Sequence, residues 1–319
     1  MKKIFKVIAT ILVAVLSLVG CNKEPKNGSS NDVQQENSVN VCNSPLLSDL
    51  SALNRSIEND MGMSTKATAK QVASVAIADI GGAVSGAKGG AKIGAMVGTF
   101  FGNPITGSVF GAFLGGVACG AFCSWAASPD NTKAGIKQME YSVVSETCIT
   151  AINQVDKIQF NDFDKVINPE KSIIEKTIID DSALKVGKLH NVVLASLNGE
   201  IQLDNNIVIE NDETELSKSI LSSAEMKELF STVTTNVANE NYLFDNSLSA
   251  AVVSLFNEVL QKCAENCEDV STIINKYQSI VAESSELTEE EKSFVSMAFS
   301  TALYSFNYWT NSSSNISTR

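Results

Sequence analysis

Glycine recurs at every fourth position of an otherwise apolar stretch, and this spacing limits how the chain can fold. The positions are Gly82, Gly86, Gly90, Gly94, Gly98 and Gly102, among residues that are mostly Ala, Val, Ile and Met. Because glycine costs about 1 kcal/mol relative to alanine inside a helix, such a helix needs a compensating interaction. Four-residue spacing aligns the glycines on one helix face, where a second backbone can approach closely. The spacing predicts a helix that packs through its glycine face, with Lys88 and Lys92 on the opposite side.

The glycine pattern stops at Asn103-Pro104 and then resumes. The residue before a proline disfavours helical geometry, so a turn is expected there. Three further glycines at four-residue spacing follow within Ile105–Ser128: Gly107, Gly111 and Gly115. Two such arms predict an antiparallel helical hairpin, each arm lying in the groove of the other. The hairpin resembles the glycine-zipper modules of bacterial envelope lipoproteins and of some secreted membrane-active proteins, and the resemblance implies a packing mode.

The second arm is also long and apolar enough to cross a membrane. About 23 residues without a charge extend roughly 35 Å as a helix, which exceeds a hydrocarbon core of about 30 Å. The first arm opposes insertion, since Lys88 and Lys92 would each cost about 2.5–3.5 kcal/mol in mid-membrane. Two interpretations stay open: the hairpin is the buried centre of a helical bundle, or it interacts with a membrane.

The first twenty residues have the organisation of a secretory leader. Three lysines within the first six residues precede the apolar run VIATILVAVLSLV, and Gly20 precedes Cys21. The final residues, LVGC, resemble the lipobox of bacterial lipoproteins. That resemblance implies a diacylglycerol on the Cys21 thiol, cleavage before Cys21 and acylation of the new amino terminus. Several acyl chains on one residue anchor a protein stably. We therefore expect an exported protein, lipid-anchored to the cell envelope.

In Gram-negative families of such lipoproteins, the residue after the lipidated cysteine influences whether the protein is sorted to the inner or the outer membrane. Asn22 is not the aspartate that such families associate with inner-membrane retention, so the outer membrane is favoured if the cell is Gram-negative. Residues 21–44 are rich in Asn, Ser and Gln and predict a flexible tether.

The net charge of the chain argues against two kinds of partner. The leader contains three of the 24 basic residues and none of the 36 acidic ones, which leaves a net charge of −15 on the mature chain. This charge argues against nucleic-acid binding and against electrostatic docking on anionic lipid.

The remaining sequence predicts an all-α protein. We divide it into a leader (1–20), a tether (21–44), N-terminal helices with the hairpin (45–128) and an α-helical domain (129–319), with a soft boundary near Pro129. Helical periodicity or caps predict helices over or near 132–155, from 168, 181–199, 223–238, 246–264, 270–282 and 289–309. Ser222 with Glu225 and Thr288 with Glu291 have capping-box spacing, which predicts the starts of the helices near 223 and 289. Residues 200–210 alone resemble strands and predict at most one small β-hairpin.

Candidate chemistry is sparse. His190 is the only histidine, and Gly187, His190 and Asn191 form a G-x-x-H-N pattern that resembles segments of uncharacterised secreted bacterial proteins. A lone histidine cannot form a multi-histidine metal site, and no nucleophile motif accompanies it. We expect a structural role for His190, no enzymatic activity, no metal and no cofactor.

The cysteines permit several states. Besides Cys21 there are six, at positions 42, 119, 123, 148, 263 and 267. An exported protein could form three disulfides from them. Buried free thiols in the hairpin are the alternative there, and a four-thiolate zinc site is disfavoured.

Three function classes follow. The leading expectation is a lipid-anchored envelope protein with a structural or interaction role, in contact with the membrane through Cys21. A protein partner or a homo-oligomer is compatible with it. The alternative is a membrane-active protein, pore-forming or effector-like, whose hairpin inserts into a target bilayer. An enzyme centred on His190 is the least favoured. Contacts of Lys88 and Lys92 with the C-terminal bundle would favour a buried hairpin over an inserting one.

Overall fold

The protein is all-α, as the sequence predicts. The structure, a computed structural model, describes residues 44–64, 66–127, 139–155, 163–204, 212–238 and 247–316. Within these ranges there are helices and turns and no β-strand. The helices are α2 (Pro45–Met61), α3 (Ala67–Phe100), α4 (Pro104–Ala127), α6 (Tyr141–Gln154), α7 (Asp164–Ile167), α8 (Lys171–Lys176), α9 (Asp181–Leu197), α10 (Asp212–Ser222), α11 (Ala224–Ala238), α12 (Leu248–Cys263), α13 (Cys267–Glu283) and α14 (Glu289–Ile316).

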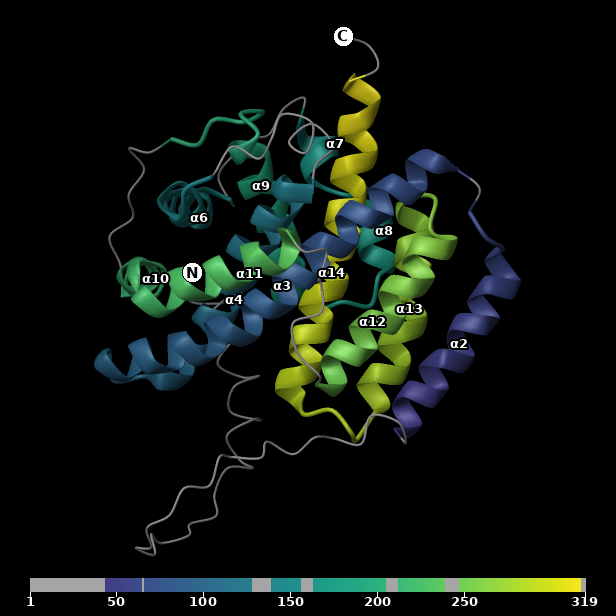
Figure 1. Ribbon diagram of the computed structural model, residues 1–319, viewed down its shortest axis with the longest axis horizontal. Helices are drawn as coiled ribbons and strands as arrows, with labels where there is room; N and C mark the ends of the chain where they lie inside the picture. The colour runs from purple at the N-terminus through teal and green to yellow at the C-terminus, as the bar shows by residue number, and fades with distance from the viewer. Residues whose placement is uncertain are drawn as a thin grey trace, which may run out of the picture.

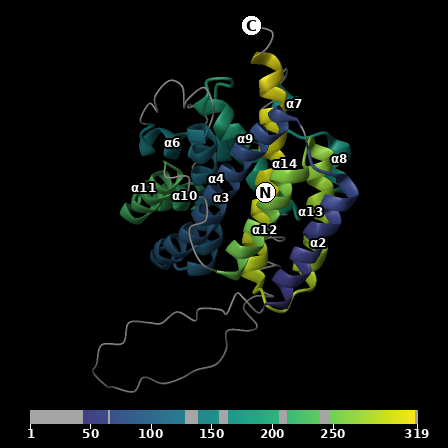
Figure 2. The same cartoon turned by 45° about the vertical axis from the view of Figure 1, so that its right-hand side comes forward.

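Helices α3 and α4 form the antiparallel hairpin that the other helices surround (Figure 1). Helix α14 packs against α3 and α9, and α9 also covers α4. Helices α2, α12 and α13 lie together on one side, and α6, α10 and α11 lie on the other, as the turned view in Figure 2 shows. One hydrophobic cluster contains buried side chains from α2 through α14. The segments on both sides of our soft domain boundary therefore contribute to one core; Pro129 itself lies outside the described residues.

The glycines of α3 and α4 bring the two backbones into direct contact. A Cβ atom added to Gly86 would lie 2.0 Å from the carbonyl oxygen of Gly115, and the reverse substitution gives the same 2.0 Å. The same reciprocal approach, at 1.9–2.1 Å, occurs in the next two pairs, Gly90 with Gly111 and Gly94 with Gly107. Real Cβ atoms essentially never lie below 3.0 Å from such a neighbour. Glycine is therefore the residue that fits these positions.

The contact extends in both directions from these pairs. At Gly98 an added Cβ would lie 2.6 Å from the carbonyl oxygen of Asn103, and at Gly82 it would lie 2.4 Å from the Sγ atom of Cys123. Both glycines are thus part of the interface that the spacing predicts.

Gly102 is the exception, and its assignment as a packing glycine is wrong. It lies in the turn between the arms with φ of 73°, and an added Cβ would have no neighbour within 4 Å. Its role is conformational, because L side chains disfavour positive φ. The turn also holds the start of α4, where the Asn103 Oδ1 atom accepts a hydrogen bond from the Thr106 amide at 3.0 Å.

A capping box and a proline determine where two other helices begin. The capping box is confirmed: the Thr288 amide donates to Glu291 Oε2 at 2.9 Å, and the Glu291 amide donates to Thr288 Oγ1 at 3.2 Å. The helix expected from Asn168-Pro169 begins only at Lys171. Asn168 is extended, with φ of −111° and ψ of 129°, because a residue before proline avoids helical space.

Two further expectations differ from what the structure contains. The cap of α11 is Ser223 rather than Ser222, and its hydroxyl accepts a hydrogen bond from the Met226 amide at 3.1 Å. The expected small β-hairpin is absent from residues 200–204, and residues 205–210 lie outside the described residues.

Adjacent glycines on α4 offer a matched test of the backbone contact. Gly115→Ala places a Cβ against the Gly86 carbonyl, whereas at Gly116 the nearest atom, the carbonyl oxygen of Ala83, is 3.3 Å away. We expect Gly115→Ala to lower the free energy of unfolding by about 1–3 kcal/mol, since overpacking exceeds the gain in helix propensity. At Gly116 the neighbouring carbonyl needs to shift by only a few tenths of an ångström, so we expect Gly116→Ala to change the free energy of unfolding much less than Gly115→Ala does. Denaturant unfolding measures both, and equal changes would contradict the backbone contact.

Candidate functional site

The predicted site residues fall into three groups. Cys21, the predicted lipid attachment point, lies outside the described residues, as do the leader and almost all of the tether. The packing glycines other than Gly102 lie between α3 and α4. His190 lies on α9 and is fully buried, beside the base of the hairpin.

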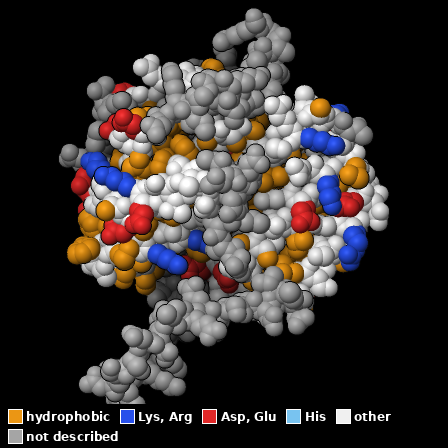
Figure 3. All heavy atoms as spheres, in the orientation of Figure 1, with side chains coloured by type: hydrophobic (Ala, Val, Ile, Leu, Met, Phe, Trp, Pro, Cys, Tyr) orange, Lys and Arg blue, Asp and Glu red, His pale blue; other side chains and the backbone are white. Residues whose placement is uncertain are grey.

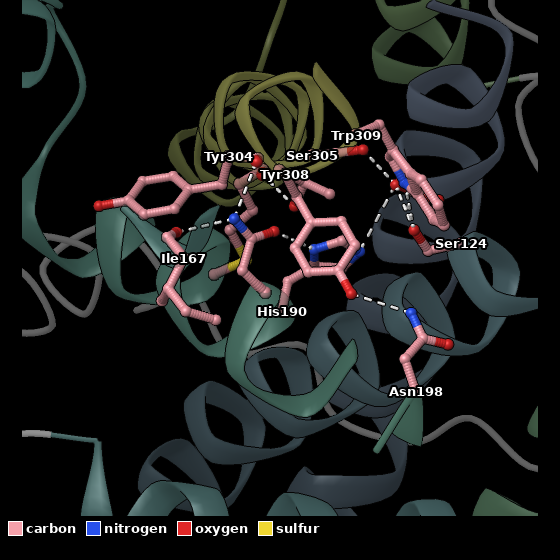
Figure 4. A network of polar contacts seen from close by, with 12 residues as sticks. Ser124, Ile167, His190, Asn198, Tyr304, Ser305, Tyr308 and Trp309 are labelled. Atoms are coloured by element: carbon pink, nitrogen blue, oxygen red, sulfur yellow. Dashed lines mark hydrogen bonds and ion pairs between the residues drawn. The ribbon is translucent and has the colours of Figure 1, made fainter. Parts of the chain in front are cut away.

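A fully buried carboxyl group, Asp79 on α3, joins three helices. Its Oδ2 atom accepts a hydrogen bond from Ser124 Oγ of α4 at 2.8 Å and another from Ser305 Oγ of α14. Trp309 of α14 donates from Nε1 to Ser124 Oγ at 3.0 Å (Figure 4). Asp79, Ser124 and Ser305 have no exposed surface, and Trp309 is buried. The base of the hairpin is thereby tied to α14 by hydrogen bonds as well as by apolar packing.

His190 approaches the same carboxyl group from α9. Its Nε2 atom is 3.7 Å from Asp79 Oδ2, and its Nδ1 atom is 3.1 Å from Asn191 Oδ1. Asn191 donates through Nδ2 to the carbonyl oxygens of Ile167 and Tyr304, at 2.8 Å each. These two bonds fix the amide orientation, so Oδ1 must accept and His190 Nδ1 must carry a proton. In the neutral ring, the unprotonated Nε2 atom therefore faces Asp79.

Burial determines the ionisation of this pair. Loss of solvation raises the pKa of Asp79 to about 8, although hydrogen bonds from Ser305 and Ser124 oppose the rise. Loss of solvation lowers the pKa of His190 to about 4. Near pH 7 the carboxyl group of Asp79 is consequently protonated and the His190 ring is uncharged.

The cluster contains Asp, His and Ser, yet its connections differ from those of a nucleophilic triad. Ser124 donates to Asp79 and not to His190, so the imidazole is not placed to activate its hydroxyl. Asp79, Ser124 and His190 are each 0% exposed, which closes the cluster to a substrate in this conformation. The arrangement fixes the positions of α3, α4, α9 and α14 relative to one another.

Sequence reasoning identified His190 and missed Asp79. A signal was present, because Asp79 is the single acidic residue of α3 and lies one turn before the glycine stripe. An ionisable side chain in so apolar a segment requires a buried partner. Its partners Ser124 and Ser305 could not be identified, since 226 positions separate Asp79 from Ser305 in the sequence.

The described cysteines are free thiols: Cys119, Cys123, Cys148, Cys263 and Cys267. Those in the hairpin match the buried-thiol alternative, and burial raises the pKa of Cys119 to about 12. Cys42 lies outside the described residues. No group of three or more His, Cys, Asp or Glu side chains that could hold a metal ion occurs in the part of the chain that the structure describes.

No protein-family model, curated protein or solved structure matches this chain. Among the described helices, α4 alone is long and apolar enough to cross a membrane, and 67% of its most apolar window is buried inside the fold.

The Asp79–His190 pair gives stability a defined pH dependence. Because the pKa of Asp79 is higher in the folded state, its contribution is complete below pH 3.8 and is lost as the pH rises to about 8. The pKa of His190 is lower in the folded state, so its contribution is complete above pH 6.5 and is lost as the pH falls to about 4. The two effects oppose each other between about pH 4 and 6.5. Between pH 6.5 and about 8 only Asp79 acts.

Asp79→Asn isolates this effect, because an amide keeps an acceptor oxygen for the serine hydroxyls and does not titrate. From pH 6.5 to about 8, we expect the free energy of unfolding of the wild-type protein to fall by about 2 kcal/mol relative to that of the variant. Denaturant unfolding across this range gives the difference. His190→Gln retains Asp79 and should retain the fall. A pH-independent difference between wild type and Asp79→Asn would show that the carboxyl group does not titrate there.

Proposed function

We propose that this protein is a lipid-anchored component of the cell envelope with a structural or interaction role, in which the glycine hairpin stays packed inside the helical body. The observation that carries the proposal is the attachment of the hairpin base to the bundle. Asp79 on α3 and Ser124 on α4 bond to side chains of α14, and His190 of α9 lies beside them.

The lysines of α3 also support a packed hairpin. Lys88 donates from Nζ to Ser247 Oγ, the residue that caps α12. Lys92, one turn further along, is exposed. Insertion of the hairpin as a pair of membrane spans would move both lysines and the Asp79 carboxyl group into hydrocarbon, at several kcal/mol in total. It would also uncover the apolar surfaces of α9 and α14 that the hairpin now buries.

The lipid anchor in this proposal is Cys21, followed by the polar tether. A flexible chain of the tether's length has a root-mean-square span of about 25 Å. The helical body would then stand close to the bilayer while remaining free to turn toward it. The membrane is the first partner in this arrangement, and a protein partner or second copy would bind the helical body.

Cys21→Ala tests the anchor. We expect it to abolish incorporation of labelled fatty acid and to move most of the protein out of the membrane fraction, since it removes the thiol that receives the lipid. Cys42→Ala, which removes the other cysteine near the amino terminus, is the matched control and should retain both properties. Labelling that persists in Cys21→Ala would contradict the anchoring proposal.

Cys148 reports whether the hairpin leaves the bundle. This thiol on α6 is fully buried in a layer that packs against α4, and its pKa is raised by burial. We expect it to resist alkylation equally with and without lipid vesicles, as measured by peptide mapping. The protein in denaturant supplies the reference for full modification. Rapid alkylation that appears only with vesicles would favour release and insertion of the hairpin.

A further inference from the structure

The closed end of the hairpin is an exposed apolar surface. Six large hydrophobic residues are exposed among the described residues, and three of them lie here: Met96, Phe100 and Phe101. Their exposed fractions are 51%, 89% and 50%. Hydrophobic side chains gather on this end of the molecule at the lower left of Figure 3. We call the segment from Met96 to Pro104 the hairpin tip.

The tip is bounded by a cation and contains no charge. No acidic or basic residue occurs between Ile93 and Ala127. Lys92 is exposed and precedes Phe100 by eight residues, which corresponds to about 12 Å along the helix. On α3, an apolar end of about this height is therefore followed by one positively charged side chain.

The glycine contacts make the tip narrow and directed outward. Gly94 and Gly107 keep the backbones in contact, and Gly98 meets the Asn103 carbonyl at the last turn of α3. Because the two arms fill the space between them with backbone, Phe100 and Phe101 project away from the interface. The tip is a stiff wedge with aromatic side chains at its edge.

We propose that the hairpin tip inserts into the interface of a lipid bilayer while the base of the hairpin stays packed in the bundle. Interfacial helices bury their apolar face by about 5–10 Å, which is within the height of this tip. At that depth Lys92 lies at the level of the lipid phosphates and remains solvated. The tip enters one leaflet and does not span. This contact goes beyond the proposed anchoring, since it does not require Cys21.

The surface is too small for the alternative occupant, a second copy of the chain. Aromatic side chains bury about 150–250 Å² each, so three partly exposed side chains supply less than the roughly 800 Å² per partner of a stable interface. A bilayer has no such minimum area. The net charge of −15 also means that insertion is driven by apolar burial rather than by attraction to anionic lipid.

The fluorescence of a tryptophan introduced at the hairpin tip reports whether the tip lies in water or in lipid. We would reconstitute full-chain Phe100→Trp in phosphatidylcholine vesicles and subtract the signal of wild type, whose Trp125 and Trp309 are buried. The emission of the introduced tryptophan should shift to shorter wavelength and be quenched by lipids brominated along the acyl chains. Ile178→Trp is the matched control, because Ile178 is 57% exposed and lies between α8 and α9, away from the hairpin. It should show neither change.

Binding of the variants gives a second measurement. In a Cys21→Ala background, Phe100→Ser with Phe101→Ser should weaken vesicle partitioning by at least about tenfold, and addition of phosphatidylglycerol should change partitioning little. An unshifted, unquenched tryptophan in anchored protein would overturn tip insertion and leave lipid anchoring intact. A shift without vesicles that grows with protein concentration would overturn it in favour of a second copy. Failure of Cys21 labelling would remove the anchor without affecting the quenching result.

Discussion

Direct backbone contact between α3 and α4 is the constraint on which the arrangement of the other helices depends. At Gly86, Gly90 and Gly94 the partner carbonyl occupies the place where a Cβ would stand. Each glycine lowers the intrinsic stability of its helix, and the close packing of two long apolar helices offsets this loss. Since the facing sides contain little side-chain volume, the larger apolar residues lie on the outer faces of the hairpin. Those faces need cover, and α14, α9 and α11 provide it.

Glycine packing alone would permit several registers of the two arms, and the polar cluster selects one. Sliding the arms by one glycine pair would preserve a smooth interface but move Ser124 away from Asp79. The carboxyl group would then be buried without its donors, which is far more costly than the loss of one contact in water. Ser305 and Trp309 apply the same restriction to α14. A single ionisable side chain thus fixes the positions of three helices.

The sequence predicted the features that depend on residues close together in the chain. The glycine spacing predicted the hairpin, and the Thr288 and Glu291 capping box predicted the start of α14, because both depend on residues within one or two turns. Gly102 was misassigned since its spacing continues the stripe although α3 ends before it, at Phe100. Asp79 was missed for a different reason. Its role depends on Ser305 and His190, and no pattern in one sequence indicates which distant helix will meet it. The lipobox at Cys21 stays a prediction.

The base of the hairpin is buried in the bundle and its closed end is exposed, so the two interpretations apply to different parts of it. From Asp79 to Gly90 the arms are enclosed by α9, α11 and α14, and an ionisable side chain is stabilised there by its hydrogen bonds. The last buried hydrophobic side chain of α3 is Ile93, and beyond it Met96 and Phe100 are exposed. The glycine spacing nevertheless continues to Gly98, one turn past Gly94. A stripe required only for core packing could stop near Ile93. Its continuation keeps a projecting end stiff, which is the property that an apolar wedge requires and a core helix does not.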